Sequence, residues 1–457
     1  MRRREALRLF GAAALSGWVS PNLRGLPWAD EKEGDKPIKR LPNTFSKKKY
    51  YAFKPWNPGK TLAPVTRVTP GDGFYVHTYF DVTPFSPSQR YFAVTRLPFQ
   101  YRQPVLGDEA EVCVIDLLER SIRTVYVTKC WGYQRGANIH WGATDDRLYA
   151  NDVIDGEAVC VSIDLETTET LAYAGPLYSI APDESFVVGF PHELRDVTQL
   201  GYGVPPRDPH KLAHLPPGAA KNEGIWRTDL KTNEKRLIVS LADVAERMPT
   251  PPPFAGGTYY FWHTKYNRQS TRLLQMVRYM HPEMPDTRNI TMFTFNPDGT
   301  DVCYVPKTDR VPVWRAAGGH SNWHPDGVHV IRSMKPIGED VPRYIQARYD
   351  GTEFKILSET IRGGGNPSLE PKGKYLITDD RDYEDDVAVI KLRLVDLVAE
   401  EDAVLCTIGT IDKAALKENV FRLDGHPAWS SDYRKVSLQA APEGKRQLFV
   451  ADLNNLI

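Results

Sequence analysis

The sequence lacks the features that would place it at once in several large functional classes. Its five cysteines are an odd number and include no CxxC pair, so no disulfide framework is indicated. Lysine plus arginine and aspartate plus glutamate both number 58, and a formal net charge of zero gives no indication of a nucleic-acid or anionic-membrane partner. No G-x-S-x-G motif occurs, which argues against a hydrolase or peptidase with a serine nucleophile.

The N-terminus, MRRREALRLFGAAALSGWVS, is basic and then weakly apolar. An arginine pair followed by Leu7 and Arg8 resembles a twin-arginine export signal, and the apolar run is too short for a stable membrane span. We therefore expect an export signal over residues 1–29 and a periplasmic or extracellular protein; the alternative is a basic amphipathic helix of a cytosolic protein. Residues 30–65, rich in lysine and proline, are predicted to form a linker.

The rest of the chain carries an internal repeat with a period of roughly fifty residues. In each copy an apolar run ends in aspartate followed by leucine or glycine, which is typical of a strand that runs into an Asp-initiated turn. The copies contain Asp116, Asp164, Asp229, Asp298, Asp350, Asp396 and Asp452.

A second element alternates with the first and consists of a strand, a short polar turn and another strand, as in NIHWGATDDRLYA and HSNWHPDGVHVIR. Together the two elements give four antiparallel strands per unit, and no long helical periodicity interrupts them. We predict an all-β fold: a seven-bladed β-propeller of four-stranded antiparallel blades over residues 66–457. A strand from residues 60–80 should complete the last blade, because only NNLI follows the last copy.

Aligning the hairpin turns brings polar side chains of different units to one position, five residues before the turn proline or its equivalent. The residues there are His263, His320, Asn366 and His426, with His140 near the same place in the second unit. This position begins the innermost strand of a blade, so the side chains should converge on the propeller axis. Converging imidazoles and an amide can bind a divalent metal or supply a base that titrates near neutral pH.

The alternative for each histidine is structural, because an imidazole at this position can simply hydrogen-bond the backbone of the next blade. Two further histidines, His324 and His329, are predicted to pack within a blade or lie on the surface. Arg227 in GIWRTDL and Tyr202 in LGYGVPP are further candidates for the same rim. Their structural alternatives are an inter-blade salt bridge and a hydrophobic plug.

The order of the motifs GYG, GIWRTDL, FWHTKYN, GHSNWHPDG and GHPAWSSD resembles that of the seven-bladed propeller polysaccharide lyases. The similarity is to the oligogalacturonate lyases and, more loosely, to the ulvan lyases, and it covers most of residues 70–455. It implies β-elimination at a uronic acid, with His263 as the base that abstracts the C5 proton and Arg227 as an assisting cation. The ulvan-type enzymes further imply catalytic roles for Tyr202 and His140.

The same resemblance implies a divalent metal, Mn or Zn. Its ligands would be His320, Asn366 and His426, with Asn366 standing where the family pattern suggests histidine. The resulting hypothesis is an exported, monomeric lyase that acts on acidic oligosaccharides or polysaccharides. The alternative is a non-catalytic periplasmic propeller of the TolB or WD40 type that binds protein or glycan.

Overall fold

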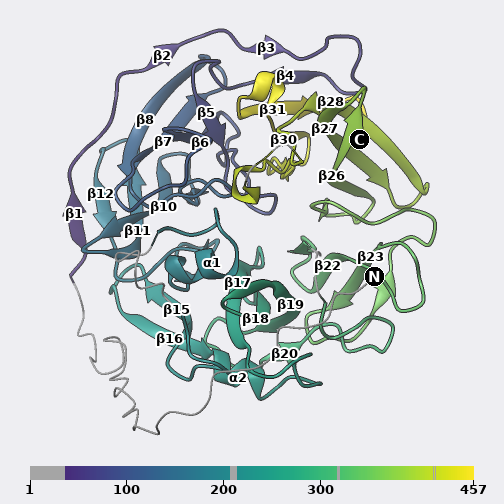
Figure 1. The fold of residues 1–457 in the computed structure, drawn as a ribbon. Coiled ribbons are helices and arrows are strands. Elements are labelled where there is room, and N and C mark those ends of the chain that lie inside the picture. Colours follow the sequence, from purple (N-terminus) through teal and green to yellow (C-terminus); the bar gives the residue numbers. More distant parts are fainter. Residues whose placement is uncertain (1–36, 206–213, 316–319, 415, 417) are drawn as a thin grey trace, which may run out of the picture. The chain divides into compact units, whose positions relative to one another are not determined.

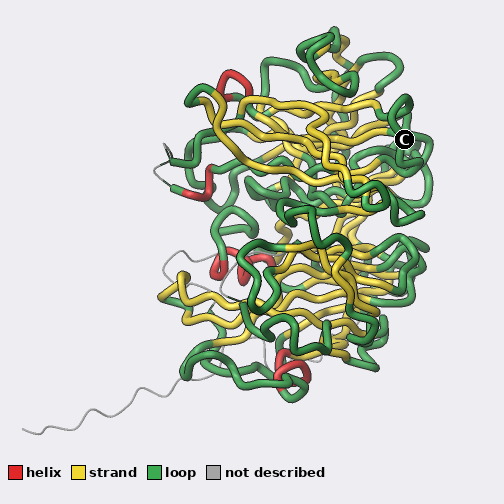
Figure 2. The backbone as a smooth tube through the Cα atoms, turned by 90° about the vertical axis from the view of Figure 1, so that its right-hand side faces the viewer, coloured by secondary structure: helices red, strands yellow, loops and turns green. Residues whose placement is uncertain are grey.

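The computed structural model describes residues 37–205, 214–315, 320–414, 416 and 418–457, and the predicted export signal lies outside them. Within this part of the chain the strands form seven small antiparallel sheets, arranged around one axis as the blades of a β-propeller (Figure 1). Figure 2 shows the strands running side by side, with loops gathered at both of their ends. The predicted fold class is confirmed.

In the described residues, four blades have the predicted four strands. In order from the centre of the ring, the third blade contains β13 (Ser179–Ile180), β14 (Phe186–Gly189), β15 (Gly224–Asp229) and β16 (Lys235–Ser240). The fourth contains β17 (Thr258–Tyr266), β18 (Leu273–His281), β19 (Met284–Phe295) and β20 (Cys303–Tyr304). The fifth contains β21 (Ser321–Trp323), β22 (His329–Met334), β23 (Arg343–Arg348) and β24 (Lys355–Ile356). The sixth contains β25 (Ser368–Leu369), β26 (Tyr375–Glu384), β27 (Val387–Asp396) and β28 (Glu401–Gly409).

The other three described blades have five strands each. The first contains β5 (Phe74–Val76), β6 (Tyr91–Leu97), β7 (Ala110–Asp116), β8 (Ser121–Thr128) and β2 (Lys49–Tyr50). The second contains β9 (His140–Trp141), β10 (Arg147–Ile154), β11 (Glu157–Asp164), β12 (Thr170–Ala172) and β1 (Lys39–Leu41). The seventh contains β29 (Ala428–Trp429), β30 (Lys435–Ala440), β31 (Gln447–Asp452), β4 (Val65–Arg67) and β3 (Lys54–Pro55).

The extra outer strands correct the expectation of a linker over residues 30–65, because residues 39–55 pair with three blades. β1 pairs with β12, β2 with β8, and β3 with β4. These strands carry lysine and proline on exposed sheet edges, where such residues are tolerated and block pairing with another chain. The composition that indicated a linker is therefore the composition of an edge strand.

The ring is closed by β4, as the repeat predicted for a strand from residues 60–80. β4 pairs antiparallel with β31, with Val65 opposite Ala451 and Arg67 opposite Phe449. Ala63 and Val65 are buried in the same hydrophobic cluster as Phe449. The closing strand therefore contributes both backbone hydrogen bonds and apolar burial to the last blade.

The repeated aspartate has a defined structural role in the turn after the third strand of a blade. Asp116 Oδ1 accepts backbone hydrogen bonds from Leu118 and Glu119, at 3.0 and 2.9 Å. The same pair of bonds is made by Asp164, Asp229 and Asp396. A carboxylate that satisfies two turn N–H groups explains why aspartate recurs at this position.

The connections differ from expectation in two places. The chain, predicted to be all-β, also contains two short helices, α1 (His192–Thr198) and α2 (Leu241–Ala245). Among the described residues no helix is long and apolar enough to cross a membrane. In the first blade, β5 is the inner strand, and the segment from residue 77 to 90 makes only isolated bridges such as Tyr79 with Val82.

We predict that removing residues 1–55 lowers the melting temperature by a few degrees but leaves cooperative unfolding intact, because only edge strands are lost. Removing residues 1–69 also deletes β4 and opens the ring, so cooperative unfolding should be lost. Thermal denaturation followed by circular dichroism measures both. Equal stability of the two truncations would contradict the closing role of β4.

Candidate functional site

A turn between β5 and β6 lies at the centre of the ring and places Tyr79 among histidines of three other blades. The Tyr79 ring centroid is 4.9 Å from that of His263, 6.2 Å from His320 and 4.4 Å from His426. The turn closes with a hydrogen bond of 3.1 Å from Val82 N to Tyr79 O. The structure thus brings together imidazoles that lie far apart in the sequence.

Local backbone irregularities aim these histidines inward. The pairing of β17 with β18 shifts register between Phe261 and Thr264, and such a bulge turns His263 out of the regular alternation. His426, two residues before β29, has a positive φ of 45°. His320 Nδ1 lies 2.9 Å from the carbonyl oxygen of Gly365, whose φ of 55° and close contact with Asp379 exclude any side chain.

His263 is held on both sides by tyrosine hydroxyls. Its Nδ1 hydrogen-bonds Tyr178 Oη, and its Nε2 lies 3.3 Å from Tyr79 Oη. Tyr178 Oη also accepts a hydrogen bond from Arg135 Nη1. We call the series Arg135–Tyr178–His263–Tyr79 the axial hydrogen-bond chain. Its members come from four different blades.

Arg135 is a buried cation without an acidic partner. Its exposed fraction is 1 %, and in the described residues its contacts are with Asn138, Tyr178 and Tyr79, none of them a carboxylate. Arg195 from α1 lies 5.2 Å from the ring of Tyr178, and its Nε and Nη1 have no hydrogen-bond partner. Burying an unpaired charge costs several kcal/mol. An anion that binds beside these arginines would offset that cost.

Burial favours the neutral form of the imidazoles at the axis. Burial lowers the pKa of His263 well below its usual value, and the nearby cations Lys265 and Arg135 lower it further. Burial lowers the pKa of His140, and separately that of His77, to about 3. Burial also lowers the pKa of Lys265 to about 8, although Asp81 at 3.2 Å opposes this shift. A neutral imidazole can accept a proton, as general-base chemistry requires.

Two of the predicted metal ligands, His320 and His426, lie around the Tyr79 ring, and each predicted ligand has a hydrogen bond of its own. Asn366 Nδ2 donates to Asp379 Oδ1 at 2.8 Å, and His426 Nδ1 lies 2.9 Å from Gln439 Nε2. Asn366 Oδ1 and His426 Nε2 are buried without partners, so donor atoms exist, but the Tyr79 ring contacts both His320 and His426. In the described residues no three His, Cys, Asp or Glu side chains form a metal site. As they are arranged in the described part of the chain, these side chains therefore do not fit a metal.

Arg227 is not part of this cluster, which corrects its predicted role beside His263. It lies on β15, the third strand of its blade, where its guanidinium stacks 3.7 Å from the Phe186 ring and donates to Pro297 O at 2.9 Å. A third strand is displaced from the axis, so its side chains contact the neighbouring blade instead. The structural alternative, an inter-blade salt bridge, is not seen in the described residues either, because the contact to the neighbouring blade is with the carbonyl oxygen of Pro297.

The two other predicted residues lie beside the axial hydrogen-bond chain. Tyr202 packs at 4.7 Å against Trp262, and its hydroxyl accepts a hydrogen bond of 3.0 Å from Arg422. Its ring centroid is 6.2 Å from that of His263. His140 begins β9, and its Nε2 lies 3.5 Å from Asn138 Nδ2. Both positions support the site without a hydrogen bond to His263 in the described structure.

Sequence reasoning did not single out Tyr79 or Tyr178. Tyr79 lies in HTYFDV, outside the repeated elements, so no alignment of the units could find it. Tyr178 stands one residue after Leu177, the residue that the turn alignment places at the axial position of the third unit. The turn alignment was therefore a usable signal for Tyr178.

Comparison with known proteins supports the architecture. The sequence matches no family model, and no curated protein matches it. The fold is similar to that of an oligogalacturonate lyase solved in complex with manganese, with a TM-score of 0.61 and 19% identity over 91% of this chain and 98% of that one. An oligogalacturonate lyase from Vibrio parahaemolyticus gives a TM-score of 0.62 and 16% identity, covering 89% of this chain and 98% of that one. The oligogalacturonate lyase-like propeller expected from the motifs is therefore the fold of this chain.

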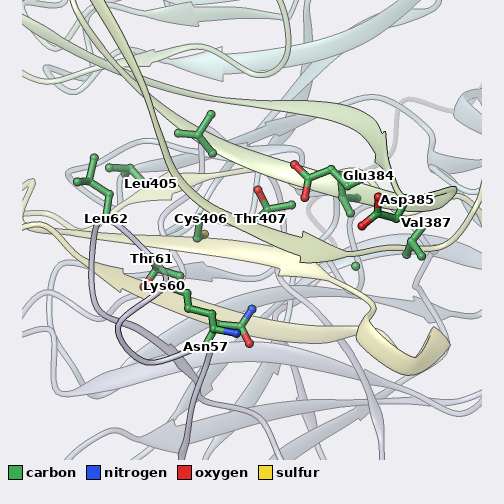
Figure 3. A pocket seen from close by; sticks show the side chains of 13 residues that line it. Asn57, Lys60, Thr61, Leu62, Glu384, Asp385, Val387, Leu405, Cys406 and Thr407 are labelled. Carbon is green, nitrogen blue, oxygen red and sulfur yellow. The ribbon is translucent and has the colours of Figure 1, made fainter.

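A pocket of about 460 Å³ lies elsewhere, between residues 57–62 and strands β26 to β28 (Figure 3). Lys60, Glu384 and Asp385 line it together with apolar side chains. None of the predicted catalytic or metal-binding residues contributes to its lining. We therefore place the candidate site at the axis and not in this pocket.

We predict that stability falls on acidification. His77 and His140 have folded-state pKa values lowered to about 3 from 6.5, so the unfolded chain binds more protons between these values. Their stabilising effect is complete above pH ~6.5 and is lost as pH falls, by up to about 1.4 kcal/mol per pH unit for each histidine. Urea denaturation at several pH values gives the unfolding free energy as a function of pH. This free energy should change less steeply with pH in His140→Gln than in the wild type, and equal steepness would contradict the assignment.

We also predict that Mn²⁺ or Zn²⁺ raises the melting temperature of the wild-type chain no more than that of His426→Gln, because the Tyr79 ring contacts the histidines that would be ligands. Differential scanning fluorimetry with and without each ion tests this. A rise of several degrees that is abolished by His426→Gln would contradict it.

Proposed function

We propose that this chain is a lyase that cleaves uronic-acid-containing oligosaccharides or polysaccharides by β-elimination. The observation that carries the proposal is the axial hydrogen-bond chain. It links the imidazole of His263 to Arg135, a buried cation that has no acidic partner among the described residues. The two groups are what this reaction needs: a base for a carbon-bound proton, and a cation for the adjacent carboxylate.

The chemistry follows from the acidity of the C5 proton of a uronate. Removing this proton places negative charge on the carboxylate attached to C5, so a cation bound there stabilises the transition state. Arg135 provides that cation in a buried environment, where it attracts the developing negative charge more strongly than it would in water. As electrons shift to form the C4=C5 double bond, the bond from C4 to the glycosidic oxygen breaks.

The tautomer of His263 determines which nitrogen acts. With the proton on Nδ1, the imidazole donates to Tyr178 Oη, which also accepts from Arg135, and Nε2 keeps its lone pair. Nε2 is then the base that takes the C5 proton. Tyr178 is a positioning residue, because it fixes the ring and contacts the cation that binds the carboxylate.

Export to the periplasm or the extracellular space, where polysaccharide fragments are found, is part of the proposal and is supported by the N-terminal arginine pattern. In this proposal the substrate is recognised through its carboxylates, which the buried arginines can bind. A role for Mn or Zn stays a prediction of the sequence, and the proposed steps do not use it.

One observation favours the alternative of a non-catalytic binding propeller. His263 has an exposed fraction of 7 % and Tyr79 of 0 %, so the base is covered in the described structure. Catalysis requires that substrate displaces part of this cover. Binding of uronate oligosaccharides without any unsaturated product would therefore support the alternative.

We predict that Arg135→Lys lowers kcat/KM for uronate oligosaccharides by about 100-fold or more, because lysine cannot both bond Tyr178 and pair with the carboxylate. Arg227→Lys, the matched control, should change it by no more than a few fold, since Arg227 lies outside the axis. The rise in ultraviolet absorbance of the conjugated C4=C5 double bond measures product.

Two outcomes decide between the assignments. If Arg227→Lys is the slower variant, the arginine mapped from the motif is the true neutralising group and our assignment is wrong. If His263→Ala, expected to lose a factor of about 10²–10⁴ as for a general base, keeps wild-type activity, the proposed base is wrong. Melting temperatures of all variants identify losses due to unfolding.

A further inference from the structure

Tyr79 contacts the proposed base from the side on which substrate must react. In the described residues its hydroxyl has one hydrogen-bond partner, His263 Nε2 at 3.3 Å. The two other tyrosine hydroxyls near His263 are already engaged. Tyr178 Oη is shared between Arg135 and Nδ1 on the opposite side of the imidazole, and Tyr202 Oη accepts from Arg422.

Resting on the proposed function, we propose that Tyr79 is the general acid of the elimination. His263 Nε2 takes the C5 proton, the C5–H electron pair forms the C4=C5 bond, and the C4–O bond breaks with its electron pair leaving on oxygen. That oxygen takes the proton of Tyr79 Oη, which becomes a phenolate while His263 becomes an imidazolium. Atoms and charge balance without any further reactant.

The contact between Tyr79 and His263 then returns both side chains to their starting protonation states. Once product leaves, the imidazolium proton on Nε2 passes directly to the phenolate across the Tyr79–His263 contact. Two cations lie close enough to stabilise the phenolate while it exists: the Arg135 guanidinium is 5.1 Å and Lys265 Nζ 5.5 Å from the centre of the Tyr79 ring. The hydrogen-bonded pair of Tyr79 and His263 is therefore the state from which each turnover starts.

Contacts of the side chains beside Tyr79 fix the backbone of this turn. Thr78 Oγ1 donates to Ile139 O at 2.7 Å, and Asp81 pairs with Lys265, whose Nζ also donates to Ser321 O at 2.7 Å. The Tyr79 hydroxyl has only the longer bond to His263. A uronate that enters between Oη and Nε2 thus breaks one hydrogen bond and leaves the phenol beside the leaving oxygen.

The test compares leaving groups that do and do not need an acid. One substrate is a uronate oligosaccharide; the other is a uronate carrying a 4-nitrophenoxy group at C4, which leaves as a stable anion. Tyr79→Phe keeps the ring in place and removes the proton. We expect it to lose about 100-fold or more of kcat on the oligosaccharide and to stay within a few fold of wild type on the aryl substrate.

The controls separate this step from folding and from the proposed function. Tyr133→Phe removes the hydroxyl of another fully buried tyrosine, bonded to Arg102 O, and should leave both rates unchanged. Equal losses of Tyr79→Phe on both substrates, or no loss on either, would overturn the acid role while the lyase function stands. No product from either substrate with the wild type would instead overturn the proposed function, and the acid role with it.

Discussion

The axial hydrogen-bond chain is the constraint on which the rest of the site depends. Arg135 precedes the inner strand of the second blade, Tyr178 that of the third, His263 lies in the fourth, and Tyr79 in the turn after the inner strand of the first. Four blades must therefore keep a fixed position around the axis for these atoms to meet. Closure of the ring by β4 supplies that fixity, because an open ring could spread and separate them.

Burial at the axis determines the protonation state of each group. The imidazoles are neutral because water is excluded and cations are near, whereas Arg135 and Arg195 remain in the interior without acidic partners in the described part of the chain. An interior with unpaired guanidinium groups is unfavourable until an anion enters. The same burial that lowers the pKa of His263 thus favours an anion at this place, in agreement with the proposed substrate.

Much of the fold could be predicted from the sequence, because Asp-initiated turns and alternating hairpins repeat with a regular period. The axial position of His263, His320 and His426 followed from the same register. Residues outside the repeat could not be found in this way: Tyr79 lies in a turn that belongs to no repeated element. Arg227 was misplaced because its role came from the resemblance, although the repeat put it on the Asp-ended strand and not on the inner one. The edge strands within residues 39–55 were missed because they have the composition of a linker.

A structure of the His263→Ala variant with a bound uronate oligosaccharide tests the central claim most directly. The account predicts a sugar carboxylate within about 3 Å of the Arg135 guanidinium, with C5 facing the position vacated by the imidazole and the leaving oxygen beside Tyr79 Oη. A ligand bound instead in the pocket between residues 57–62 and β26 to β28, or on the outer strands with the axis unchanged, would contradict it.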